Sequence, residues 1–205
     1  MMNTCFSYFL YLIIGYLIGS ILFALLITKL ATGQNIMELG NHNPGAYNVF
    51  RNVGKGWGVL TGILDAVKAL VPMLIAKYAL NIQDEIALGC LGIGALLGHG
   101  YPLYYHFEGG RAASILMGML IFFVPYEFLF SFLIGGAIVL LFIKKEYGIW
   151  GPTLIIAFSA ISCLFFPHTI EVKIIIWIGA LITLFFNRDA VQERTKKLSP
   201  AVKKK

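Results

Sequence analysis

The chain has 205 residues and a formal net charge of +6. Hydrophobic residues make up 59% of it and charged residues only 13%, whereas a soluble domain usually carries about 25% charged residues. So few charges cannot cover the surface of a water-soluble protein, and the hydrophobic residues come in long runs. We therefore expect residues 1–205 to form a single membrane domain, with no soluble module and no nucleic-acid partner.

Seven hydrophobic segments follow one another along the chain, and a helix needs about 20 mostly apolar residues to cross a bilayer. They comprise residues 7–30, 57–80, 86–105, 112–124, 128–143, 149–166 and 172–186. The first is predicted to be a retained span, because it lacks the basic start and the cleavage site of a signal peptide. The fourth and fifth fit a kinked pair of spans or a re-entrant hairpin equally well. The predicted fold class is an all-α polytopic membrane protein with about seven transmembrane helices.

Positive charge is concentrated on one side of this predicted topology. If the N-terminus lies outside, the cytoplasmic segments are approximately residues 31–56, 106–111, 144–148 and the tail 187–205. All 16 Lys and Arg residues except Lys68, Lys77 and Lys173 fall in these segments or at their edges. Because cytoplasmic loops are enriched in Lys and Arg, we expect an external N-terminus and a cytoplasmic C-terminus. The basic tail is expected to contact anionic lipids.

The first predicted cytoplasmic loop is rich in glycine and asparagine. It reads Gly40-Asn41-His42-Asn43-Pro44-Gly45-Ala46-Tyr47-Asn48-Val49-Phe50-Arg51, then Gly54-Lys55-Gly56. Successive backbone N–H groups in such turns form a concavity that binds anions, and Arg51 can grip a phosphate group through two hydrogen bonds. Lys55 adds charge, and Asn43 and Asn48 add donors. An ordinary polar connection is the alternative, although loops of about 25 residues are usually functional or disordered.

A second polar segment precedes the fourth predicted span. It reads Gly98-His99-Gly100-Tyr101-Pro102, then His106-Phe107-Glu108-Gly109-Gly110-Arg111. A diglycine followed by a cation at the start of a helix is suited to bind phosphate. His99 is interpreted either as a hydrogen-bonded interior residue or as a catalytic base.

Asp65 and Lys68 lie three residues apart, on one face of the second predicted span. Charged residues inside a span are costly and are usually functional or paired, and both interpretations stay open here. The three cysteines and four histidines show no metal-ligand spacing, and we predict neither a metal site nor a cofactor. A Ser-His-Asp enzyme is unsupported, because the chain has no Gly-x-Ser-x-Gly elbow.

The order and spacing of these motifs resemble the bacterial acyl-phosphate:glycerol-3-phosphate acyltransferases (PlsY type), from residue 15 to about residue 145. The matching stretches are Tyr16-Leu17-Ile18-Gly19-Ser20, Gly40-x-x-Asn43-Pro44-Gly45-Ala46-x-Asn48-Val49-x-Arg51, Asp65-x-x-Lys68, Gly98-His99-x-x-Pro102 and Phe107-x-Gly109-Gly110. The resemblance implies an enzyme of the bacterial inner membrane that moves an acyl group from acyl phosphate to the 1-hydroxyl of glycerol 3-phosphate. It further implies a role in phospholipid synthesis. Acyl phosphate is already activated, and positioning and charge stabilisation could carry much of the rate.

The resemblance also implies roles for individual residues. The candidate catalytic residues are Arg51, His99 and Asn41. The candidate substrate-binding residues are Gly40, Asn43, Gly45, Asn48, Lys55, Asp65, Lys68, Gly109, Gly110, Arg111 and Arg188.

Several positions depart from the family pattern. The family usually has Ser-Gly at the place of Asn41-His42, Thr at Tyr47, Lys at Arg111, and His-Arg-x-Asn where this chain reads Asn187-Arg188-Asp189-Ala190. A second hypothesis is therefore a diverged or inactive relative that binds a phosphorylated lipid or polyol phosphate. A small transporter is a third, suggested by the charged pair in the second span, although no internal repeat supports it.

Overall fold

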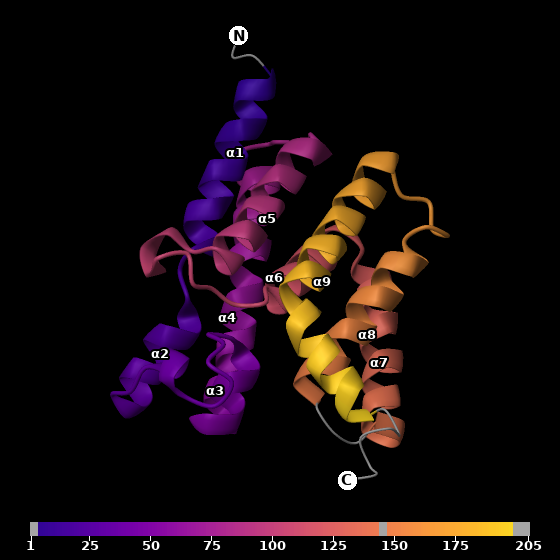
Figure 1. Ribbon diagram of the computed structural model, residues 1–205. Coiled ribbons are helices and arrows are strands. Elements are labelled where there is room, and N and C mark those ends of the chain that lie inside the picture. Colours follow the sequence, from indigo (N-terminus) through magenta and orange to yellow (C-terminus); the bar gives the residue numbers. More distant parts are fainter. Residues whose placement is uncertain (1–3, 144–146, 199–205) are drawn as a thin grey trace.

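The computed structural model describes residues 4–143 and 147–198, which form helices and loops without any strand (Figure 1). The α-helices are α1 (Thr4–Gly19), α2 (Phe23–Thr32), α3 (Ala46–Asn52), α4 (Lys55–Leu74), α5 (Glu85–Gly100), α6 (Ala113–Phe123), α7 (Pro125–Ile138), α8 (Tyr147–Ser162) and α9 (Ile170–Leu198). Short 3-10 helices occur at Ile36–Glu38 and Leu103–Tyr105, and π-helical turns at Ile75–Ala79 and Val139–Ile143 extend α4 and α7. Residues 144–146 of the predicted third loop and 199–205 of the predicted tail lie outside the described residues.

The helices agree with the predicted spans in position, but they differ in length. Among the described residues, five segments are long and apolar enough to cross a membrane: Thr4–Thr32, Lys55–Ala79, Glu85–Tyr105, Pro125–Ile143 and Ile170–Ala190. The predicted spans 112–124 and 149–166 correspond to shorter apolar helices. At 1.5 Å per residue, α6 with its 11 residues extends about 16 Å, roughly half of the hydrocarbon thickness. The loop before α6 crosses the middle of the bundle (Figure 1), which leaves only this length for the helix.

The predicted first span, residues 7–30, coincides with the apolar segment Thr4–Thr32, but this segment consists of two helices because the chain breaks between α1 and α2. The carbonyl oxygens of Gly19 and Ile21 at the break both accept hydrogen bonds from Lys68 Nζ, the first at 3.0 Å. Ser20 Oγ donates to the Tyr16 carbonyl at 2.8 Å. A lysine from α4 thus satisfies backbone groups that the break leaves without helical partners, as a membrane interior requires.

Helices α1 and α5 approach each other closely and lie side by side in Figure 1. A Cβ atom at Gly15 would overlap the Leu91 carbonyl oxygen, and one at Gly94 would overlap the Leu12 carbonyl oxygen. Small residues at such an interface allow two backbones to come into van der Waals contact, which is a principal source of helix association in membranes. The glycine-rich face of α5 therefore holds this helix firmly against α1.

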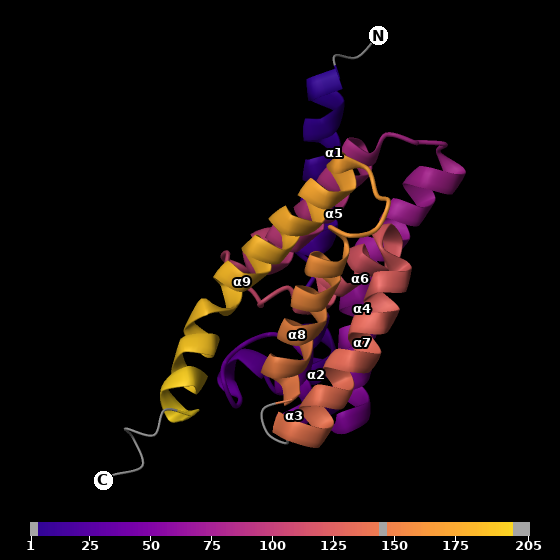
Figure 2. The ribbon, with the colours of Figure 1, turned by 90° about the vertical axis from the view of Figure 1, so that its right-hand side faces the viewer.

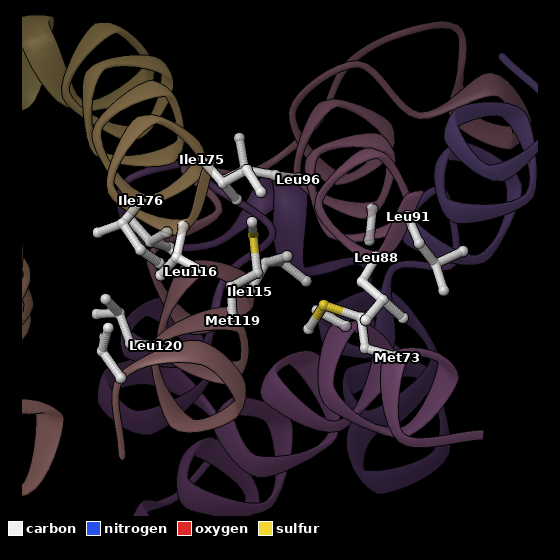
Figure 3. Packing of buried hydrophobic residues seen from close by; sticks show 14 of the residues in the cluster. Met73, Leu88, Leu91, Leu96, Ile115, Leu116, Met119, Leu120, Ile175 and Ile176 are labelled. Atoms are coloured by element: carbon white, nitrogen blue, oxygen red, sulfur yellow. The ribbon is translucent and has the colours of Figure 1, made fainter. Parts of the chain in front are cut away.

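The hydrophobic core lies where α4, α5, α6 and α9 meet (Figure 3). Four α6 side chains in it are 0% exposed, namely Ile115, Leu116, Met119 and Leu120. They pack with residues of the neighbouring helices, among them Met73 of α4 and Ile176 of α9. Helix α6 is therefore central to the bundle despite its short length.

Helix α9 crosses the bundle obliquely and ends at the opposite end of the molecule from the start of α1 (Figure 2). The last predicted span ends at residue 186, but α9 continues without interruption to Leu198. The described part of the predicted tail is therefore helical. This extension carries Arg188 beside the loop that precedes α6.

Candidate functional site

A polar cavity of about 690 Å³ lies between α3, α4 and the starts of α6 and α8. Its size falls in the range of small-molecule binding sites, about 300–1,000 Å³. The predicted site residues that line it are Asn41, Asn43, Gly45, Arg51, Lys55, Asp65, His99 and Arg111. Arg51 and Lys55 are exposed, so that their charges are available to a ligand that enters from the solvent. The cavity therefore combines cations and amides from both glycine-rich segments.

Asn48 holds the first glycine-rich loop in shape from within. Its side chain is buried, and its amide nitrogen donates to the carbonyl oxygens of Ile36 at 3.1 Å and Leu39 at 2.9 Å. Its Oδ1 atom accepts from Asn52 Nδ2 at 2.7 Å. Gly40 has a φ of 57° and packs against these amides so closely that a Cβ atom would overlap them. Neither Gly40 nor Asn48 lines the polar cavity, and both shape the loop that does.

Asp65, Lys68 and His99 meet at the inner end of the polar cavity, and all three are buried. Lys68 Nζ lies 3.1 Å from Asp65 Oδ1 and 3.0 Å from His99 Nδ1. An ammonium group has only donors, so that His99 Nδ1 accepts, and the ring proton is assigned to Nε2. Lys68 thus joins α4 to the end of α1 and to α5, while Asp65 and His99 border the cavity.

Gly109 and Gly110 cross directly over the end of α5. Gly110 N donates to the His99 carbonyl at 2.9 Å. A Cβ atom at Gly110 would overlap the His99 ring, and one at Gly109 would overlap the carbonyl oxygens of His99 and Gly100. Both positions therefore require glycine for close backbone approach, whether or not a phosphate group binds there.

A smaller cavity of about 270 Å³ adjoins the polar cavity and contains this diglycine. Asn43 and Arg111 border both spaces. Arg188 lines only the smaller one, with its guanidinium 4.0 Å from the centre of the Phe185 ring. The predicted phosphate-binding residues are thus divided between two adjoining spaces, with Arg111 between them.

A third, apolar cavity of about 190 Å³ lies between α8 and α9. It shares four residues with the polar cavity, Ala113, Gly148, Pro152 and Asn187. Most of its other lining side chains are aliphatic or aromatic, which suits a hydrocarbon chain. The polar and the apolar cavity together can therefore bind a ligand that has a polar head and an apolar tail.

Four polar residues that line the polar cavity are absent from the predicted set: Tyr47, Ser114, Tyr147 and Asn187. Asn187 Nδ2 donates to the Arg111 carbonyl at 3.2 Å and to the Thr183 carbonyl at 2.8 Å. A signal for Asn187 existed, because it occupies the histidine position of the His-Arg-x-Asn pattern. Ser114 carried no comparable signal, because the residues after it are hydrophobic.

Within the described part of the chain, no group of three His, Cys, Asp or Glu residues could hold a metal ion. The basic side chains that line the polar cavity are Arg51, Lys55 and Arg111, and such groups act on an anionic ligand through hydrogen bonds and charge. Such a site is able to hold phosphate groups and to stabilise negative charge that develops during a reaction.

The fold and the cavities define a helical membrane protein in which a cation-lined polar space adjoins an apolar one. Residues 9–196 match the family model for glycerol-3-phosphate acyltransferase. The chain belongs to this family, and the predicted all-α membrane fold is confirmed.

Proteins of this family align with most of the chain. Glycerol-3-phosphate acyltransferase 1 of Lactobacillus johnsonii is 35% identical over 92% of this chain and 90% of its own length. The Bacillus cereus protein of the same name is 33% identical over 88% of this chain and 97% of its own. The crystal structure of PlsY, an integral membrane glycerol 3-phosphate acyltransferase, in its glycerol 3-phosphate form superposes with a TM-score of 0.82. That match has 29% identity and covers 93% of both chains.

Proposed function

We propose that the protein transfers an acyl group from acyl phosphate to the 1-hydroxyl of glycerol 3-phosphate. The products are lysophosphatidic acid and inorganic phosphate. The observation that carries this proposal is the cation-lined cavity, which shares a wall with an apolar cavity. Family membership supports the acyl transfer, and a related structure in a lysophosphatidic acid form, with a TM-score of 0.81, agrees with the proposed product.

The adjoining polar spaces suit a reaction in which both substrates carry phosphate. Arg51 and Lys55 border the larger space, Arg188 the smaller, and Arg111 both. The glycerol oxygen bonds to the acyl carbonyl carbon, the bond from that carbon to the phosphate oxygen breaks, and the hydroxyl proton ends on the phosphate product. Charge moves onto the carbonyl oxygen and the leaving phosphate, where fixed cations stabilise it most. No covalent intermediate with the enzyme is required.

His99 and Asn41 take different roles in this proposal. His99 has its Nδ1 occupied by Lys68, so that the ring acts as a donor from Nε2 rather than as the base that takes the hydroxyl proton. Asn41 lines the polar cavity and contributes an amide that can hydrogen-bond substrate oxygens. Gly45 and Asn43 belong to the same wall and keep the backbone close to the bound phosphate.

The proposed location is the bacterial inner membrane, with the N-terminus outside and the polar cavity on the cytoplasmic side. This orientation places nearly all Lys and Arg residues of the sequence on that side, in line with the positive-inside tendency. The basic C-terminal segment then faces anionic lipids. In a chain whose native cysteines are replaced by serine, single cysteines at Lys29 and at Asn81 should react with an impermeant thiol reagent from opposite sides of the membrane. Labelling from the same side would contradict this topology.

A direct assay tests the reaction. Purified protein in lipid, given palmitoyl phosphate and labelled glycerol 3-phosphate, should yield labelled lysophosphatidic acid. Absence of product from folded protein would overturn the proposal. Binding of glycerol 3-phosphate without turnover would then favour the diverged relative, and flux of an organic phosphate into proteoliposomes would favour the transporter.

A further inference from the structure

Tyr47 lines the polar cavity and contacts a residue that borders both cavities. It belongs to the first turn of α3 and is partly buried. Its ring rests against Gly148 at the start of α8, where a Cβ atom would overlap the ring carbons Cγ and Cδ2. Gly148 itself borders both cavities. The ring therefore occupies the space that a side chain at position 148 would need, beside the wall that the two cavities share.

We propose that Tyr47 determines which acyl donors the protein uses; this inference rests on the function proposed above. The boundary between the cavities is formed by Ala113, Gly148, Pro152 and Asn187. A donor whose carbonyl carbon reacts in the polar cavity and whose tail lies in the apolar one crosses this boundary within its first few carbons. The Tyr47 ring narrows the passage on the Gly148 side. It therefore excludes donors that carry a branch next to the carbonyl group.

The contact between Tyr47 and Gly148 makes this wall rigid. A tyrosine ring has only two side-chain torsions and loses little conformational entropy when it is fixed. The backbone of α8 blocks movement of the ring in one direction, because the ring already lies against Gly148. One extra methyl group in a tight apolar space changes selectivity by about 10–200-fold. A fixed ring is thus sufficient to distinguish a straight acyl chain from one branched at the second carbon.

The test compares hexadecanoyl phosphate with 2-methylhexadecanoyl phosphate as donors, with glycerol 3-phosphate as acceptor. The wild-type protein should prefer the straight donor in kcat/KM by at least about tenfold. Tyr47→Ala should lower this preference about tenfold, because it widens the passage. Tyr47→Phe should keep the preference, because the ring and not the hydroxyl group forms the wall. The KM for glycerol 3-phosphate should change much less than the donor ratio.

Two glycines of α8 supply a matched pair of variants. Gly148→Ala should displace the Tyr47 ring and change the ratio of kcat/KM for the straight and the branched donor. Gly151→Ala should leave this ratio unchanged, because nothing lies within 4 Å of a Cβ atom at position 151. The double variant Tyr47→Ala with Gly148→Ala should fold as well as Tyr47→Ala, because the extra methyl group then has room.

The outcomes separate this inference from the proposed function. If Tyr47→Ala has the same ratio of kcat/KM for the two donors as the wild-type protein, the inference is overturned. This includes the case in which kcat/KM falls equally for both donors, which indicates a purely structural role. If the folded wild-type protein transfers neither acyl group, the proposed function fails and the inference fails with it. If it uses the straight donor, the proposed function stands whatever the ratio.

Discussion

The two sides of the bundle pack differently around the polar cavity. Helices α1 and α5 meet backbone to backbone, with Gly15, Gly19 and Gly94 in contact with carbonyl groups of the facing helix. Helices α8 and α9 enclose an apolar cavity instead. There the hydroxyl of Thr183 and the indole nitrogen of Trp177 are buried without a hydrogen-bond partner. One side is thus closely packed, while the other keeps internal space.

This difference corresponds to the two chemical demands of the proposed reaction. The close packing fixes the end of α5, which carries His99 and supports the diglycine segment at Gly109 and Gly110. Charge stabilisation depends on groups that are fixed before the substrate arrives. A hydrocarbon chain needs volume and an apolar surface rather than fixed donors. We infer that the close packing positions His99 and the diglycine segment, whereas the space between α8 and α9 leaves room for an acyl chain.

The largest effect is expected from a change on the closely packed side. Gly94→Leu would drive a side chain into the Leu12 carbonyl group, and a clash with backbone cannot be relieved by a rotamer change. Little folded protein should be obtained, as measured by size-exclusion chromatography and thermal unfolding. Gly136→Leu in α7, where a Cβ atom meets nothing within 4 Å, is the matched control and should remain folded. Equal behaviour of the two variants would show that the contact between α1 and α5 is not critical.

The next largest effect should follow loss of the buried cation. Lys68→Met leaves the Asp65 carboxylate buried without its partner, which typically costs about 3–5 kcal/mol. It also removes the donor to Gly19 and Ile21 at the helix break. Lys68→Met combined with Asp65→Asn should recover part of the unfolding free energy, and a double-mutant cycle measures how much. A double variant as unstable as the sum of the single ones would mean that the ion pair contributes no coupling.

Hydrophobic patterning was sufficient to predict the apolar helices, but it missed α3, which lies in a segment predicted to be a loop, and it did not indicate where the helices break. The break after Gly19 depends on Lys68, which is 49 positions away in the sequence, and no local pattern contains that information. The short α6 depends on the loop before it, whose path is set by contact with α5. Ala112, the residue directly before α6, has a φ of 57°. This conformation costs alanine about 1–2 kcal/mol, and the sequence does not indicate it.

The site was predictable where its residues come from one segment. Asn41, Asn43, Arg51 and Lys55 are close in sequence, and the structure places them in one cavity wall. Tyr147 and other residues of the opposite wall come from helices much later in the chain, and their proximity depends on tertiary packing. The burial of Asn48 could be seen only in the structure, because an asparagine that shapes a loop and one that binds a ligand look alike in sequence.

Arg51 provides a test of the polar cavity itself. Arg51→Lys keeps the charge but loses the planar fork that holds a phosphate group by two hydrogen bonds. We expect a fall in kcat/KM of about 100-fold, with the thermal unfolding temperature unchanged, because Arg51 is exposed. Lys29→Met, outside the three cavities, is the control and should retain activity. An Arg51→Lys variant with wild-type kinetics would show that this side chain does not hold a substrate.

The smallest effect is expected on the open side, and it should be a gain. Thr183→Val removes a buried hydroxyl group that has no hydrogen-bond partner, a group whose burial costs about 1–3 kcal/mol. Thr153 lines the same cavity but donates to the Ile149 carbonyl at 2.7 Å, so that Thr153→Val removes a hydrogen bond and should give no gain. Thermal unfolding of both variants, in the same lipid or detergent, measures the difference. If Thr183→Val proves the less stable of the two, the hydroxyl has a partner in the membrane-bound protein, and the space between α8 and α9 is not the purely apolar site that an acyl chain would occupy.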